Sequence, residues 1–177
     1  MKHFFKLFGS LMADQFIGCI SGFMLVLCVA AFFKNSLMGF SLAFIISFGF
    51  YAYVTYNSAF KSGFHDSHRA IKDENYSGYL YMGAAAGALS AAPLMILYII
   101  YKALNAGILG VYYMVANMYW TWPMINIFPN HQPLVMPLVA IPIILIPWLG
   151  YIAGYKNFLL TDYFMKLYQK FNNQNNQ

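Results

Sequence analysis

Charged side chains are scarce in this chain of 177 residues. Asp, Glu, Lys and Arg together make up 8% of the sequence, and only five residues are acidic. A soluble domain typically carries about 25% charged residues. Because 61% of the residues are hydrophobic, too few polar side chains remain to cover a surface in water. The composition excludes an ordinary soluble domain and indicates a membrane protein.

Cysteines and catalytic motifs are also scarce. Cys19 and Cys28 lie in one apolar stretch, roughly 13 Å apart along a helix axis, which is too far for a disulfide. The sequence contains no G-x-S-x-G motif, no H-E-x-x-H motif and no glycine-rich phosphate loop. We therefore expect no catalytic residue, no metal ligand set and no bound cofactor.

Long apolar stretches dominate the rest of the chain. A helix rises 1.5 Å per residue, so about 20 apolar residues cross a hydrocarbon core of about 30 Å. The sequence predicts one all-α domain over residues 1–177, a polytopic integral membrane helical bundle. Its four predicted spans cover residues 13–33, 37–60, 79–101 and 134–154. A cytoplasmic loop is predicted at 61–78 and a disordered polar tail at 172–177.

A fifth apolar stretch, 108–128, differs from the other four in its aromatic and polar content. It contains Tyr112, Tyr113, Tyr119, Trp120, Trp122, Asn117 and Asn126. Tyrosine and tryptophan prefer the headgroup level, where an apolar ring and a polar tip are both satisfied. We expect this segment to be an interfacial or re-entrant helix. The alternative is a fifth transmembrane helix.

The distribution of basic residues favours four spans. With four spans, one side of the membrane holds Lys2, Lys6, Lys61, Arg69, Lys72, Lys156, Lys166 and Lys170, and the other holds Lys34 and Lys102. Basic loops stay in the cytoplasm, so a multi-pass protein of the cell membrane with both termini cytoplasmic is predicted. The net charge of +5 then reflects orientation in a lipid bilayer and gives no reason to expect a nucleic-acid partner.

Small residues recur at four-residue spacing in three of the predicted spans. They are Gly18 and Gly22 in the first, Gly83, Gly87 and Ala91 in the third, and Gly150 and Gly154 in the last. This spacing places small residues on one helix face, where two backbones can approach closely. The face can serve packing within the chain. Alternatively, the third span docks another membrane protein.

Three prolines, Pro137, Pro142 and Pro147, fall inside the last predicted span. Each removes a backbone hydrogen bond and clashes with the preceding turn. A helix broken in this way can line a transport pathway, to which Trp120 and Trp122 of the aromatic segment would contribute. The alternative is that these prolines are ordinary features of a membrane helix, where proline is common.

The predicted loop at 61–78 concentrates the polar chemistry. If this stretch were helical, His65, His68, Arg69 and Lys72 would share one face and form a basic stripe at the headgroup level. A metal site or an interfacial enzyme using His65, His68 and Asp73 is a more distant alternative, because no third well-placed zinc ligand is evident.

Asp14 is expected at the cytoplasmic end of the first span, in reach of water or Lys6. The apparent lack of buried ionisable residues argues against a proton pump or a proton-coupled carrier.

Two functional hypotheses follow. The first is a small non-catalytic subunit or accessory protein of a membrane complex, suggested by size and small-residue faces. The second is a small transporter or substrate-binding membrane component for an uncharged or aromatic solute.

Overall fold

The computed structural model describes residues 2–33, 36–72, 79–105 and 107–156, which form helices joined by turns, with no strand among them. In chain order the elements are α1 (Lys2–Phe32), α2 (Leu37–Lys72), α3 (Met82–Leu104), α4 (Gly107–Ala116), α5 (Thr121–Ile127), the short 3-10 helix η1 (Pro129–His131), α6 (Gln132–Leu138) and α7 (Ala140–Tyr155).

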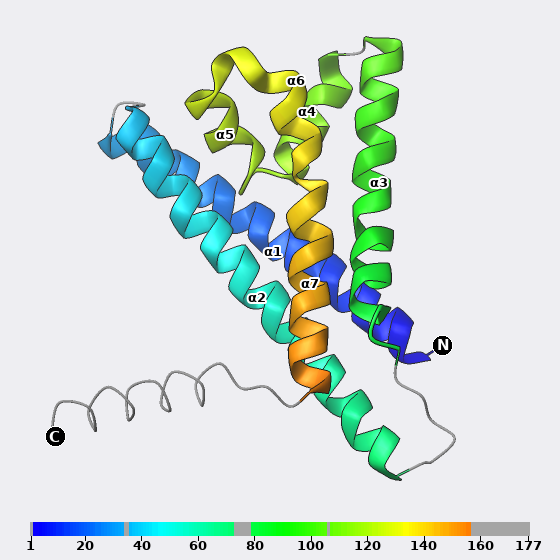
Figure 1. The fold of residues 1–177 in the computed structure, drawn as a ribbon. Helices are drawn as coiled ribbons and strands as arrows, with labels where there is room; N and C mark the ends of the chain where they lie inside the picture. The colour runs from blue at the N-terminus through cyan, green and yellow to red at the C-terminus, as the bar shows by residue number, and fades with distance from the viewer. Residues whose placement is uncertain (1, 34–35, 73–78, 106, 157–177) are drawn as a thin grey trace, which may run out of the picture.

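Four segments of the described chain are long and apolar enough to cross a membrane: His3–Val29, Leu37–Lys72, Met82–Leu104 and Pro129–Tyr155. This confirms the predicted all-α bundle of four spans with a shorter apolar helix, α4, beside them. The four spans alternate in direction along the chain (Figure 1). One end of the bundle, which we call the N-terminal end, holds the starts of α1 and α3 and the ends of α2 and α7.

Two helices extend beyond the spans predicted for them. Helix α2 continues past residue 60 to Lys72, so residues 61–72 of the predicted loop are helical. A helix persists here because the stretch contains no proline, and its buried side, including Gly63 and Asp66, packs against α7. The first helix also begins at Lys2, well before residue 13. Residues 73–78 and the predicted tail at 172–177 lie outside the described residues.

Glycines set the closest helix contacts near the N-terminal end. A Cβ placed on Gly83 of α3 would lie 2.5 Å from the carbonyl oxygen of Pro147 in α7. A Cβ on Gly150 of α7 would lie 2.6 Å from the carbonyl oxygen of Tyr56 in α2. Since only glycine fits such contacts, the backbones of α2 and α3 both approach α7 directly.

Helices α1 and α2 form one pair, and α3 and α7 form another. The pairs cross near the N-terminal end and diverge toward the opposite end (Figure 1). The helices α4 and α5 lie between the diverging pairs, with α4 against α1 and α3 and α5 against α2. The segment 107–131 therefore enters and leaves on the same side, as a re-entrant hairpin.

Candidate functional site

The turn of this hairpin, residues 117–120, lies inside the bundle. The ten residues of α4 extend roughly 15 Å, which is half of a hydrocarbon core of about 30 Å. At that depth the turn meets the middle of α1, where a Cβ on Gly22 would lie 2.5 Å from the backbone nitrogen of Tyr119. Tyr119 also stacks on Tyr51 of α2, with ring centroids 4.2 Å apart. Glycine in α1 thus makes room for irregular backbone at membrane depth.

Side chains add hydrogen bonds to the carbonyl groups of the turn, of which Met114, Val115 and Asn117 also accept from backbone N–H groups. The Thr121 hydroxyl is within 2.8 Å of the Met114 carbonyl and 3.0 Å of the Asn117 carbonyl. The Ser47 hydroxyl lies 3.0 Å from the carbonyl oxygen of Tyr119. Cys19 approaches the Val115 carbonyl at 2.7 Å. Non-helical backbone at membrane depth needs such partners because lipid supplies none.

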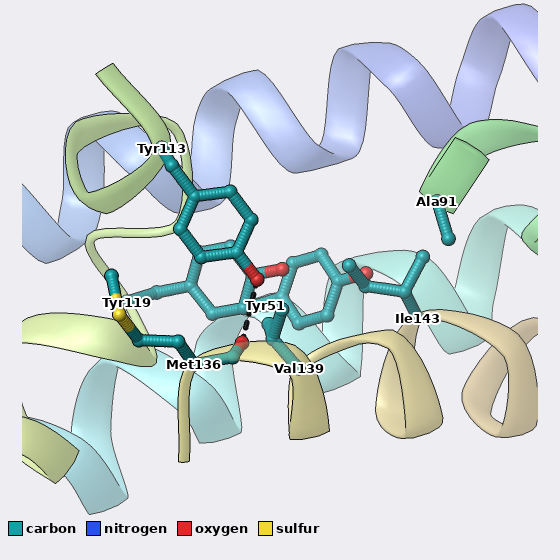
Figure 2. Packing of buried hydrophobic residues seen from close by; sticks show 7 residues of the cluster. All are labelled: Tyr51, Ala91, Tyr113, Tyr119, Met136, Val139 and Ile143. Atoms are coloured by element: carbon teal, nitrogen blue, oxygen red, sulfur yellow. Dashed lines mark hydrogen bonds between the residues drawn. The ribbon is translucent and has the colours of Figure 1, made fainter. Parts of the chain in front are cut away.

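The regular hydrogen bonding of the last span is interrupted at Val139, between α6 and α7, although the Val139 backbone keeps helical angles. Aromatic donors from the hairpin and from α3 reach the carbonyls of α6. The Tyr113 hydroxyl donates to the Met136 carbonyl at 2.6 Å (Figure 2). Trp120 donates from Nε1 to Val135 at 3.1 Å. The Tyr98 hydroxyl of α3 lies 3.1 Å from the Pro133 carbonyl, whose helical donor is missing at the proline four residues later.

A cluster of buried polar side chains, which we call the polar floor, lies beneath the hairpin turn. It comprises Asp14 and Gln15 of α1, Tyr51 and Thr55 of α2, and Tyr119 of the turn. All five are buried, and Asp14 and Gln15 are only 5% and 6% exposed. Tyr51 interacts with Gln15, Thr55 and Tyr119, and Asp14 interacts with Ser58. Four of their polar atoms nevertheless make no hydrogen bond of normal geometry among the described residues: Asp14 Oδ2, Gln15 Nε2, Thr55 Oγ1 and the Tyr119 hydroxyl oxygen. Unpartnered buried polar groups are costly, and they mark this region as the candidate site.

Asp14 lies about 18 Å along α1 from Lys2 and is buried inside the bundle, so the expected access of its carboxyl group to water is not found. Its place relative to the membrane surface stays a prediction. The carboxyl group is enclosed by α1 and α2, close to Ser58. A proton pump or proton-coupled carrier was disfavoured because no buried ionisable residue was expected. Since Asp14 and Asp66 are both buried, that reason no longer applies.

A cavity of about 350 Å³ adjoins the polar floor. Its lining is contributed by α1, α3 and α4: Met12, Gln15, Phe16, Cys19, Leu94, Tyr112, Val115 and Ala116. Phe16 and Tyr112 at its rim are 68% and 61% exposed, so the cavity opens sideways, toward the surface that lipid would cover. Its wall is mainly apolar, and the polar side chains among its lining residues are Gln15, Cys19 and Tyr112.

The predicted small-residue faces lie at contacts within the chain. Gly18 lies against the ring of Tyr51, and a Cβ on Gly87 would be 2.7 Å from the Ile143 carbonyl oxygen. That carbonyl lacks its helical donor because the residue four positions later is Pro147. Gly154 lies against the backbone of Phe60. Ala91 is buried in the central core cluster with Ile143 (Figure 2).

The predicted pathway residues do not line this cavity. Trp120 packs edge-on against Phe44 and Phe48, and Trp122 packs edge-on against Phe40. Pro147 lies in the α3–α7 contact, and Pro137 and Pro142 flank the interruption at Val139. Of these five residues, only Trp120 and Trp122 make these ring contacts at the hairpin.

The basic residues near the end of α2 separate into two groups. His65 and Arg69 line a second cavity together with α1. His68 instead contacts the Phe64 ring at a tilt of 46°, with ring centroids 4.2 Å apart, and its Nδ1 lies 3.0 Å from the Phe64 carbonyl oxygen. Lys72 is exposed and does not line that cavity. Asp66, one residue after His65, is buried and accepts a hydrogen bond from the Tyr151 hydroxyl at 2.7 Å.

The sequence analysis did not predict the polar floor, although the residue spacing of α2 contains a signal for it. Every fourth residue of α2 from Ser47 to Gly63 is small or polar, apart from Tyr51, and all five are buried. On one face of a transmembrane helix, such a stripe indicates contact with other helices or with polar groups.

Within the described parts of the chain, no three His, Cys, Asp or Glu side chains are grouped so as to hold a metal ion. The chain matches no known family model, no curated protein and no solved structure.

Proposed function

We propose that this multi-pass membrane protein is a substrate-binding or transport component that takes up a small, uncharged, mainly apolar molecule into the cavity between α1, α3 and α4. The observation that carries the proposal is the Gln15 amide. Gln15 is almost fully buried and borders a mostly apolar cavity. Tyr51 interacts with this side chain, but its Nε2 makes no hydrogen bond of normal geometry among the described residues. A ligand carbonyl or ether oxygen would accept from this amide when the side chain turns toward the cavity.

The size and the opening of the cavity support the same class of ligand. Sites for small molecules are typically about 300–1,000 Å³, mostly apolar, with few polar groups that fix orientation. At about 350 Å³ this cavity fits a single-ring compound. The exposed rim residues face the region occupied by lipid, so an apolar molecule dissolved in the bilayer could enter without crossing water.

The accessory-subunit hypothesis stays a prediction. Its main support was the small-residue face of the third span, and Gly83 and Gly87 on that face are covered by α7 of the same chain. A partner protein on α3 would have to use its exposed side, which carries Ile96 and Ile99. Because α7 already covers the small-residue face of α3, that face no longer gives a reason to expect a partner protein on α3.

Thermal unfolding of the full chain in mild detergent tests the binding proposal. Acetophenone and ethylbenzene are similar in shape, but only acetophenone carries an acceptor oxygen. We expect both to raise the unfolding temperature, acetophenone more, because a ligand that binds the folded state stabilises it. Gln15→Leu should remove the difference between the two compounds.

Ala116→Phe, which fills the cavity, should abolish both shifts. Leu89→Phe, on the exposed side of α3 away from the cavity, should leave both shifts unchanged. Equal shifts in the original protein and in the Ala116→Phe variant would show that the compounds act through the detergent, and the proposal would fail.

A further inference from the structure

A second cavity, of about 150 Å³, lies at the N-terminal end of the bundle between α1 and α2. It is lined by His3 and Lys6 of α1 and by Ser62, His65 and Arg69 of α2. The α1 residues are three positions apart, and the α2 residues are spaced by three and four. Each set therefore lies on one helix face, and the two faces meet across the cavity. We call it the basic cavity.

No carboxylate of the described residues balances the charges of the basic cavity. Lys6 and Arg69 each contribute a cationic group, and Arg69 donates directly to Nε2 of His3. Only two carboxylate side chains belong to the described residues. Asp66 is buried and bonded to Tyr151, and Asp14 belongs to the polar floor; neither lines the cavity. The start of α1, at Lys2, adds the partial positive charge of a helix N-terminus.

We infer that the basic cavity binds a phosphate group. Phosphate offers several acceptor oxygens and at least one full negative charge, which matches an Arg fork beside a Lys ammonium and imidazole N–H groups. Liquid water occupies about 30 Å³ per molecule, so the cavity holds about five waters, enough for one phosphate group. The sequence predicted one basic stripe of His65, His68, Arg69 and Lys72. Of these four residues, only His65 and Arg69 line the basic cavity.

The location at one end of the transmembrane bundle permits two sources for the phosphate. It can belong to the headgroup of an anionic lipid, or it can be a free phosphate ion from solution. Both present the same oxygens to Lys6 and Arg69, and the choice between them is experimental.

Binding at the basic cavity can be measured through the unfolding temperature of the full chain in an uncharged detergent. One titration uses inorganic phosphate against chloride at constant ionic strength. The other uses phosphatidic acid against phosphatidylcholine in mixed micelles. We expect a saturable rise in at least one titration, because binding to the folded state stabilises it. A rise with inorganic phosphate identifies an ion site, and a rise with phosphatidic acid alone identifies a lipid headgroup site.

Variants that each remove one positive charge distinguish a specific phosphate site from general attraction of anions to this end of the helix bundle. Lys6→Gln and Arg69→Gln should each raise the titrant concentration at the midpoint about tenfold or more, because each removes a charge-assisted hydrogen bond to the phosphate. Lys72→Gln removes the same charge from the same end of α2 outside the cavity and should leave the midpoint unchanged. Arg69→Lys, which keeps the charge but loses the fork, should give an intermediate loss and replaces Arg69→Gln if that variant does not fold.

The inference is overturned if neither titrant gives a saturable rise. It is equally overturned if Lys72→Gln weakens binding as much as Lys6→Gln does, because the positive charge of the helix end would then suffice.

Discussion

The two ends of this bundle are held together in different ways. Near the N-terminal end, α2, α3 and α7 touch backbone to backbone at Gly63, Gly83, Gly150 and Gly154. Toward the other end the helix pairs diverge, and the hairpin of α4 and α5 occupies the space between them (Figure 1). There the contacts are made by aromatic rings and by side chains that donate to backbone carbonyls.

The difference shows where this protein places its chemistry. Glycine contacts bring backbones together, so the N-terminal half leaves little space where α2, α3 and α7 meet, and its smaller basic cavity lies between α1 and α2. The hairpin half needs polar side chains because the backbone of its turn is irregular. Those side chains, together with the space between diverging helices, give the polar floor and the larger cavity. We therefore expect the first half to dominate stability and the second to bind the uncharged ligand.

The largest loss of stability is expected from Gly154→Leu. Its side chain would overlap the backbone of Phe60 in α2, and backbone cannot move aside as a flexible side chain can. Overpacking costs about 1–3 kcal/mol and occasionally more, and we expect the upper end or failure to fold. Gly49→Leu is the matched control, because a Cβ on Gly49 meets nothing within 4 Å. Unfolding in mixed micelles measures both, and equal losses would remove the distinction between the halves.

The next largest effect is expected from Asp66→Ala. It takes away the acceptor that the Tyr151 hydroxyl contacts at 2.7 Å inside the bundle. A hydrogen bond to a charged group contributes about 1.5–3 kcal/mol, and the free energy of unfolding should fall by that order. Asp66→Asn keeps an acceptor oxygen and should lose less. If the two variants lose equally, the carboxylate matters through its charge and not through this contact.

A moderate effect is expected from Thr121→Val in the hairpin. The substitution keeps the shape but removes the hydroxyl that bonds the Met114 and Asn117 carbonyls. A neutral hydrogen bond contributes about 1 kcal/mol net, so the unfolding free energy should fall by about that amount. Ligand-induced stabilisation should fall as well, because the turn lies above the polar floor. Ser41→Ala, which removes an exposed hydroxyl within α2, serves as the control and should change neither quantity.

The smallest change in stability is expected from Asp14→Asn. The Asp14 carboxyl has an oxygen without a partner, so it is not held by a complete set of bonds, and its replacement should leave the unfolding free energy within about 1 kcal/mol. A loss larger than that of Thr121→Val would show that Asp14 is a structural group of the hairpin half.

The four spans were predictable because apolar length alone determines them. The end of α2 was not, since residues 61–72 are polar, and their helix depends on Gly63 and Asp66 meeting α7. The re-entrant course of 108–128 was one of two predicted forms. The polar floor joins Asp14 to Tyr119, residues far apart in the sequence, and such pairing depends on how the helices cross. Local patterns of hydrophobicity contain no information about that crossing.

The depth of the hairpin turn is the most direct test of this account. A single spin label at Val115, with Cys19 and Cys28 replaced by alanine, reports depth in a bilayer through its access to oxygen and to a water-soluble nickel chelate. Val115 is 47% exposed and lies one residue before the end of α4, so a label fits there. Labels at Leu104 and Asn130 report the two ends of the segment.

The re-entrant hairpin predicts a Val115 label near the bilayer centre, with Leu104 and Asn130 both accessible from the same side. A Val115 label at headgroup depth would show that the segment lies on the surface. Accessibility of Leu104 and Asn130 from opposite sides would show a fifth span. Either result would contradict the fold and the cavity built on it.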